Sequence, residues 1–158
     1  SFHLISDAFL KGGKGIVLVQ GSLRSGLTAT AMHYGRDAGL ALNYMYGIPA
    51  AEALGVNLAG SYNTFLNQRC SLQLVNPAAA EERVTVSTTR YDGTRTLGNG
   101  LELVVPSHGL LDFNLCSRDV LDVYGVVIVQ PERVNGLMGT VIRLGSSDQY
   151  RFPTELRQ

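Results

Sequence analysis

The stretch RVTVSTTRYDG, residues 83–93, decides the fold class. Its first nine residues are rich in β-branched side chains, and they begin by alternating apolar with polar positions, as a half-buried strand does. Asp92-Gly93 ends the stretch, and this pair favours a hairpin turn because both positions tolerate a positive φ. The stretch therefore predicts an antiparallel strand that turns at Gly93 and returns through residues 94–97.

Turn residues and short apolar runs continue from this hairpin to the end of the chain. Asn99-Gly100 has the same turn chemistry, and Pro106 to Gly109 interrupts the chain again. Further strands are predicted over residues 72–75, 101–105, 110–116, 124–130, 137–144 and 150–152. Helical patterns are limited to two single turns, over Ala50–Leu54 and Ser117–Leu121. Short strands separated by turns at this spacing are typical of an all-β, antiparallel sandwich or barrel.

The composition limits the classes of function. Of the 158 residues, 45% are apolar and 16% are charged, which is enough apolar material for a core. Thirteen basic residues balance thirteen acidic ones, so the positive excess typical of a nucleic-acid binder is missing. The longest apolar runs, such as Val126–Val129, are far shorter than the roughly 20 residues of a membrane span. We therefore expect neither nucleic-acid binding nor membrane insertion.

An internal repeat is the most informative feature of the chain. GIVLVQ at residues 15–20 matches GVVIVQ at residues 125–130, and the same spacing of 110 residues aligns further identities downstream. These are Gly26 with Gly136, Leu27 with Leu137, Thr30 with Thr140 and Gly35 with Gly145. Eight identities in 21 positions exceed the roughly one or two that composition alone would supply. Upstream, with one residue of gap, Phe2–Ser6 matches Phe113–Ser117.

The repeat predicts two unequal units. Residues 1–59 (copy 1) are a partial copy, the back half of a unit, because nothing in them matches roughly residues 67–112. Residues 60–158 (copy 2) are a complete copy, of the size of an immunoglobulin-like sandwich. The expected strands of copy 1 cover residues 2–5, 15–20, 27–34 and 40–46, with a linker over residues 47–61. Copy 1 should not close its own core, so we expect self-association or cover by an upstream segment that the start at Ser1 leaves out.

Four turn and strand motifs follow one another in copy 2. An Asn-Pro turn ends Leu72–Pro77, and a Val-Thr-Val strand leads to Tyr91-Asp92-Gly93. Leu103–Gly109 then precedes the Gly-Val-Val-x-Val strand of Gly125–Val129. In these motifs copy 2 resembles the tandem immunoglobulin-like β-sandwich repeats of bacterial secreted and cell-surface proteins. The resemblance implies that the Asn-Pro and Asp-Gly pairs are turns, and that the domains serve as spacers, stalks or adhesive modules.

No catalytic, cofactor-binding or metal-binding residue is predicted. Ser107-His108 with Asp112 has the residue types of a hydrolytic triad, but sequence neighbours do not face one another across a site, so a turn is favoured. His3 and His33 align with other polar residues in copy 2, so neither histidine position is kept as a metal ligand. The aspartates lack the spacing of a calcium loop, and calcium at the junction of the copies stays an alternative for Asp92, Asp112, Asp119 and Asp122.

Three tyrosines and two cysteines are the remaining candidates. Tyr44, Tyr46 and Tyr62 lie near the junction of the copies, where packing between the units is favoured over ligand binding. Cys70 and Cys116 are too far apart for a CxxC pattern, and a disulfide within copy 2 is favoured over two buried thiols. Copy 1 has Ile5 at the position of Cys116 and lacks the stretch that would hold its partner.

Two functions follow from these observations. The first is a non-enzymatic structural or adhesive repeat, a part of a larger assembly that is secreted or displayed at the cell surface. The alternative is a binding module for a carbohydrate or a peptide, which would use the three tyrosines or an exposed sheet edge. Neither function needs a cofactor, and the expected partners are a second copy, the upstream segment, or a glycan or protein ligand.

Overall fold

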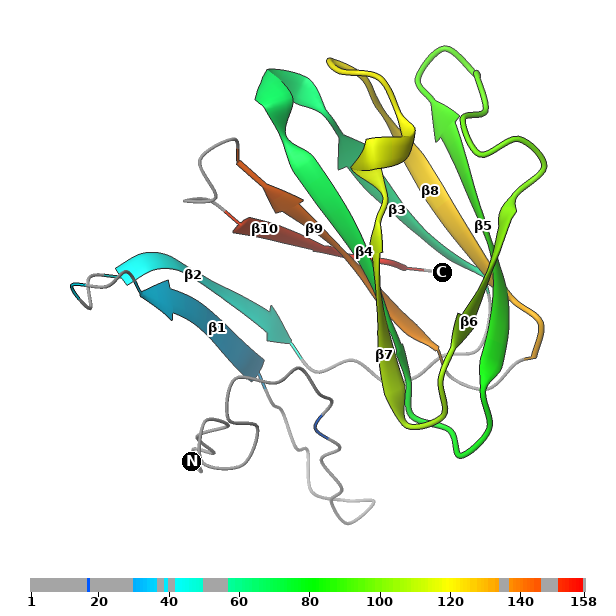
Figure 1. The fold of residues 1–158 in the computed structure, drawn as a ribbon, viewed down its shortest axis with the longest axis horizontal. Helices are drawn as coiled ribbons and strands as arrows, with labels where there is room; N and C mark the ends of the chain where they lie inside the picture. Colours follow the sequence, from blue (N-terminus) through cyan, green and yellow to red (C-terminus); the bar gives the residue numbers. More distant parts are fainter. Residues whose placement is uncertain are drawn as a thin grey trace.

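The computed structural model describes residues 17, 30–36, 39, 42–49, 57–133, 137–145 and 151–157, and the fold is all-β and antiparallel, as predicted. The strands are β1 (Thr30–Arg36), β2 (Leu42–Pro49), β3 (Leu58–Asn63), β4 (Arg69–Asn76), β5 (Glu82–Arg90), β6 (Leu101–Val105), β7 (Gly109–Asn114), β8 (Tyr124–Pro131), β9 (Met138–Leu144) and β10 (Arg151–Glu155). Two short 3-10 turns, η1 (Phe65–Asn67) and η2 (Cys116–Arg118), lie at one end of the fold (Figure 1).

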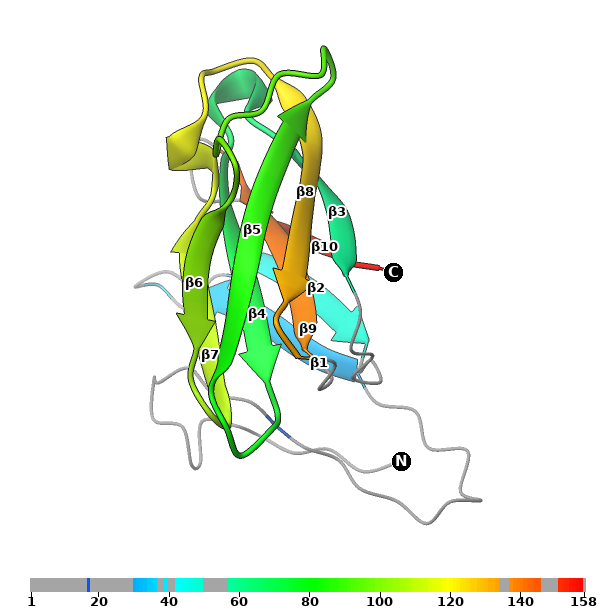
Figure 2. The ribbon, with the colours of Figure 1, turned by 90° about the vertical axis from the view of Figure 1, so that its right-hand side faces the viewer.

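Two four-stranded sheets pack against each other to form a sandwich. One sheet has the strand order β3-β8-β5-β6 and the other has the order β10-β9-β4-β7. Figure 2 shows the first sheet in front of the second, with the core between them. β1 and β2 form a separate hairpin, and β2 lies against β10 at the edge of the second sheet (Figure 1).

Alternating side chains build the core. Cys70, Leu72 and Leu74 of β4 point inward and are buried, whereas the residues between them are half-exposed. Val84 and Val86 of β5 come from the facing sheet and join the same cluster. This period of two is what the sequence showed, and burial of each such side chain contributes about 1.5–3 kcal/mol.

The strand order departs from that of a constant-type immunoglobulin domain. In that domain the first, second, fourth and fifth strands share one sheet, and the third, sixth and seventh share the other. Counting from β3, the first strand here pairs with the sixth, β8, and the seventh strand, β9, pairs with the second, β4. The first and seventh strands have therefore exchanged sheets, which strand patterns alone do not reveal.

The first strand of the sandwich was not predicted. Residues 47–61 were expected to be a linker, but β2 extends to Pro49 and β3 begins at Leu58. Small residues with low β-propensity, Ala59-Gly60-Ser61, conceal β3 in the sequence. Gly60 is required by packing, because a Cβ there would lie 2.3 Å from Cδ2 of the buried Leu156.

Other local expectations have mixed outcomes. The turn at Ser117–Leu121 is a 3-10 turn over Cys116–Arg118, capped by the Asn114 side chain, which accepts a hydrogen bond from the Ser117 amide (3.3 Å). The expected turn at residues 50–54 and strand at residues 2–5 lie outside the described residues. Of the expected strand at residues 15–20, the structure describes Val17, which is in no strand and is 53% exposed.

The Asn-Pro turn holds one end of the sandwich together. The Asn76 amide donates to the carbonyl of Ala80 (2.8 Å), and its oxygen accepts from the amide of Ala78 (3.0 Å). The Ala78 carbonyl in turn accepts from the amide of His108 (2.9 Å), which ties this turn to the Pro106–Gly109 turn. These two motifs of the resemblance are therefore structural in this fold.

Candidate functional site

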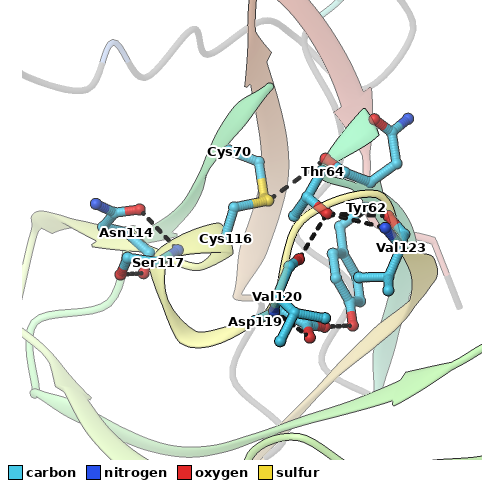
Figure 3. Close-up of a disulfide and its surroundings, with 10 residues drawn as sticks. Tyr62, Thr64, Cys70, Asn114, Cys116, Ser117, Asp119, Val120 and Val123 are labelled. Carbon is cyan, nitrogen blue, oxygen red and sulfur yellow. Dashed lines mark hydrogen bonds between the residues drawn. A yellow bond between two sulfur atoms is a disulfide. The ribbon is translucent and has the colours of Figure 1, made fainter. Parts of the chain in front are cut away.

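A disulfide fastens the end of the sandwich that carries η1 and η2. Cys70 at the start of β4 is bonded to Cys116 in η2, with a Cα–Cα distance of 5.0 Å (Figure 3). The Leu115 amide also donates to the carbonyl of Cys70 (3.1 Å). Of the two alternatives for this pair of cysteines, the structure has the disulfide, and both residues are buried.

Thr64 connects this end to the loop at residues 119–123. Its hydroxyl donates to the Val120 carbonyl (2.8 Å) and accepts from the Val123 amide (3.0 Å). The Thr64 amide donates to the Val123 carbonyl (2.8 Å). Thr64 is buried, so the loop is anchored away from competing water (Figure 3).

A buried network of Tyr62, Arg90 and Asp119 fixes the same loop to two strands of the first sheet. The Tyr62 hydroxyl donates to Asp119 Oδ2 (2.6 Å), and Arg90 Nε donates to Asp119 Oδ1 (2.8 Å). The Asp119 side chain is 2% exposed. Charge-assisted hydrogen bonds of this kind are stronger than neutral ones, so they hold three separate segments in one arrangement.

The network shifts the acidity of both acids in it. Burial, together with the hydrogen bond to Asp119, raises the pKa of Tyr62 to about 12. Burial acts to raise the pKa of Asp119, but the hydrogen bonds from Arg90 and Tyr62 outweigh it, so the pKa is lowered from 3.8. At neutral pH Tyr62 therefore stays a donor and Asp119 stays a charged acceptor.

Three stacked aromatic rings lie on the outside of this end; we call Phe65, Tyr91 and Tyr124 the aromatic row. The ring centroids of Tyr91 and Tyr124 are 4.9 Å apart with an angle of 17° between the planes, and those of Phe65 and Tyr124 are 6.0 Å apart at 30°. Their exposed fractions are 41% for Phe65, 63% for Tyr91 and 50% for Tyr124. The row follows from strand pairing, since the Tyr91 amide donates to the Tyr124 carbonyl (3.0 Å).

Small side chains continue the outer face of the sheet below the aromatic row. Val126 points outward between Ser61 of β3 and Thr89 of β5, which are its partners on the neighbouring strands. Beyond the strand ends, the loops expose Leu66, Val120 and Leu121. An uncharged face with an apolar rim is suited to contact with another molecule.

The predicted aromatic candidates are not brought together. Tyr62 is 2% exposed, with its hydroxyl bonded to Asp119, so it is neither a surface aromatic nor part of the packing between the units. Tyr44 and Tyr46 are in β2, opposite Gly35 and His33 of β1, and their side chains lie outside the described set. The aromatic row could not be found from the sequence, because it depends on the pairing of β5 with β8.

The polar candidates of the sequence are engaged locally. His108 is exposed in the turn between β6 and β7 with a φ of 46°, and Asp112 accepts hydrogen bonds from Ser71 and Gln73 on β4. Asp92 accepts from the Thr94 amide (2.9 Å), which closes its own turn. Within the described ranges, no three metal-ligating side chains gather, and no helix is long and apolar enough to cross a membrane.

The chain was compared with family models, curated proteins and solved structures. Nothing matches. The geometry of the sandwich and of its disulfide end therefore has to support any functional proposal.

Proposed function

We propose that this chain is a non-enzymatic structural or adhesive β-sandwich repeat of a secreted or cell-surface protein. In this proposal a partial immunoglobulin-like copy (residues 1–59) precedes a complete one (residues 60–158), and the fold itself performs the function. The single observation that carries the proposal is the pairing of two hairpins, one in each copy.

The β1–β2 and β9–β10 hairpins have the same register once the copies are aligned. Thr30, Ala31 and Met32 pair with Pro49, Ile48 and Gly47, and at spacings of 110 and 106 residues these become pairs observed in copy 2. The observed pairs are Thr140 with Glu155, Val141 with Thr154, and Ile142 with Pro153. The difference between the two spacings falls in the loop between the strands, and Tyr44 and Tyr150 are identical at the spacing of 106.

Two features of copy 2 support an extracellular, load-bearing role. A buried disulfide suits an oxidising compartment, because thiols stay reduced in the cytosol. The polar side chains at the disulfide end, Tyr62, Arg90 and Asp119, bond to one another and so serve rigidity. A repeat that transmits force or presents a surface needs such a braced end.

Surface labelling tests the proposal. An antibody raised against the folded chain should label intact cells that make the protein, or find it in their medium. Treatment of intact cells with a protease should remove the label from the cell surface before lysis. An epitope that becomes accessible only after lysis would contradict the proposal. The Cys70–Cys116 pair provides a second readout, since thiol alkylation before lysis should leave both cysteines unmodified.

The aromatic row favours a second candidate, a module that binds a carbohydrate or a peptide. Aromatic rings at a surface supply large contact areas with little loss of rotamer entropy. On a glycan array this candidate predicts binding that falls about tenfold or more in a Tyr91→Ala/Tyr124→Ala variant. Val104→Ala, at an exposed position of β6, is the matched control. Equal signals from the wild type and the double variant would leave only the structural role.

A further inference from the structure

One edge of the β1–β2 hairpin differs from its counterpart in copy 2. β9 has two neighbours in its sheet, β10 on one side and β4 on the other. In the part of the chain that the structure describes, β1 has one neighbour, β2. Under the repeat proposed above, the strand that would correspond to β4 belongs to the part of the unit that copy 1 lacks.

Exposure at matched positions shows the same difference. Val127 and Val141 of copy 2 are fully buried, whereas Val17 is 53% exposed and Ala31 is exposed. Ile142 is 3% exposed, but Met32 at the matching position is 55% exposed. Side chains that are covered in the complete copy thus face water in the partial one.

We propose that the outer edge of β1 is a docking site for an antiparallel strand of the β4 type, supplied by a partner polypeptide. This proposal rests on the repeat organisation of the proposed function and adds the place and the chemistry of the partner. Strand addition of this kind gains main-chain hydrogen bonds along the edge and specificity from alternate side chains.

The pairing of β4 with β9 defines the chemistry that the partner needs. Leu72 lies opposite Val141, and Ser71 lies opposite Ile142. Leu72 and Leu74 are fully buried on the inner face of β4, while the side chains between them are half-exposed. The partner strand should therefore have apolar residues at every second position, with one of them opposite Ala31. Ala31 is smaller than Val141, which leaves room there for a large apolar side chain.

A synthetic peptide of residues 67–77, with Cys70→Ser, tests the site on the full chain. Titration of the labelled peptide should show saturable binding by fluorescence anisotropy. Hydrogen exchange should slow over residues 30–36 and stay unchanged in β6 and β7, the other edge strands beside the core. A matched peptide with Leu72→Ser and Leu74→Ser should bind about tenfold or more weakly, since its apolar contacts are removed.

Variants of the chain separate the outcomes. Ala31→Asp should abolish binding of the peptide, and Val104→Asp on β6 should leave it unchanged. The cooperative unfolding of the sandwich, followed in parallel, shows that Ala31→Asp has left copy 2 folded. Absence of binding, or slowed exchange at β6 or β9 in place of β1, would overturn the proposal. A dimer that Ala31→Asp converts to a monomer would also overturn it, because a second copy would then occupy the edge. None of these results bears on the surface labelling that tests the proposed function.

Discussion

Removal of the disulfide by Cys70→Ala with Cys116→Ala should lower the free energy of unfolding by about 4 kcal/mol. The bond joins residues 46 positions apart, and a cross-link that closes a loop of this length lowers the entropy of the unfolded chain by about that amount in the chain-entropy model. Alanine is preferred to serine, because both positions are buried and an unpaired hydroxyl would add its own cost. Urea denaturation of the oxidised wild type and of the double variant measures the difference.

Reduction of the wild type is the control for this prediction. The reduced protein should unfold at nearly the same urea concentration as the double variant, and both should show a steeper dependence on urea. The steeper dependence is expected because an unfolded chain without the cross-link exposes more surface. If oxidised and reduced protein unfold at the same urea concentration, the disulfide does not stabilise this end of the sandwich.

The elements that local pattern defines were predicted well. The strand expected at residues 101–105 is β6 with the same bounds, and the strand expected at residues 124–130 is β8 with one more residue. The Asp92-Gly93 turn is present, with Gly93 at a φ of 86°. Alternation and turn chemistry act over a few residues, so a single sequence carries them.

The elements that depend on distant contacts were missed. β3 has a weak local pattern and becomes a strand by pairing with β8, more than 60 residues away in the chain. The exchange of the first and seventh strands between the sheets is likewise a matter of pairing. Tyr62 shows the same limit in the site: its position near the junction suggested the surface, but Asp119, 57 residues away, draws its hydroxyl into a buried network.

The Asp119 network carries the second large effect. Asp119→Asn should lower the free energy of unfolding at pH 7 by about 2–3 kcal/mol, because the change removes the charge that faces Arg90 and weakens the hydrogen bond from Tyr62. The value lies below that for a fully buried pair, since the Arg90 side chain keeps 21% of its surface exposed. Asp92→Asn is the matched control, at an exposed aspartate in a turn.

The pH dependence identifies the charge as the cause. The pKa of Asp119 is lowered in the folded state from 3.8, so the unfolded chain takes up the proton at a higher pH than the folded one. The stability that Asp119 contributes is therefore complete above pH 3.8 and is lost as the pH falls through the folded-state pKa. The difference between wild type and Asp119→Asn, measured by urea denaturation from pH 7 to about pH 2, should shrink in this acid range. A difference that stays constant over the whole range would show that Asp119 acts through packing and neutral hydrogen bonds, without a contribution from its charge.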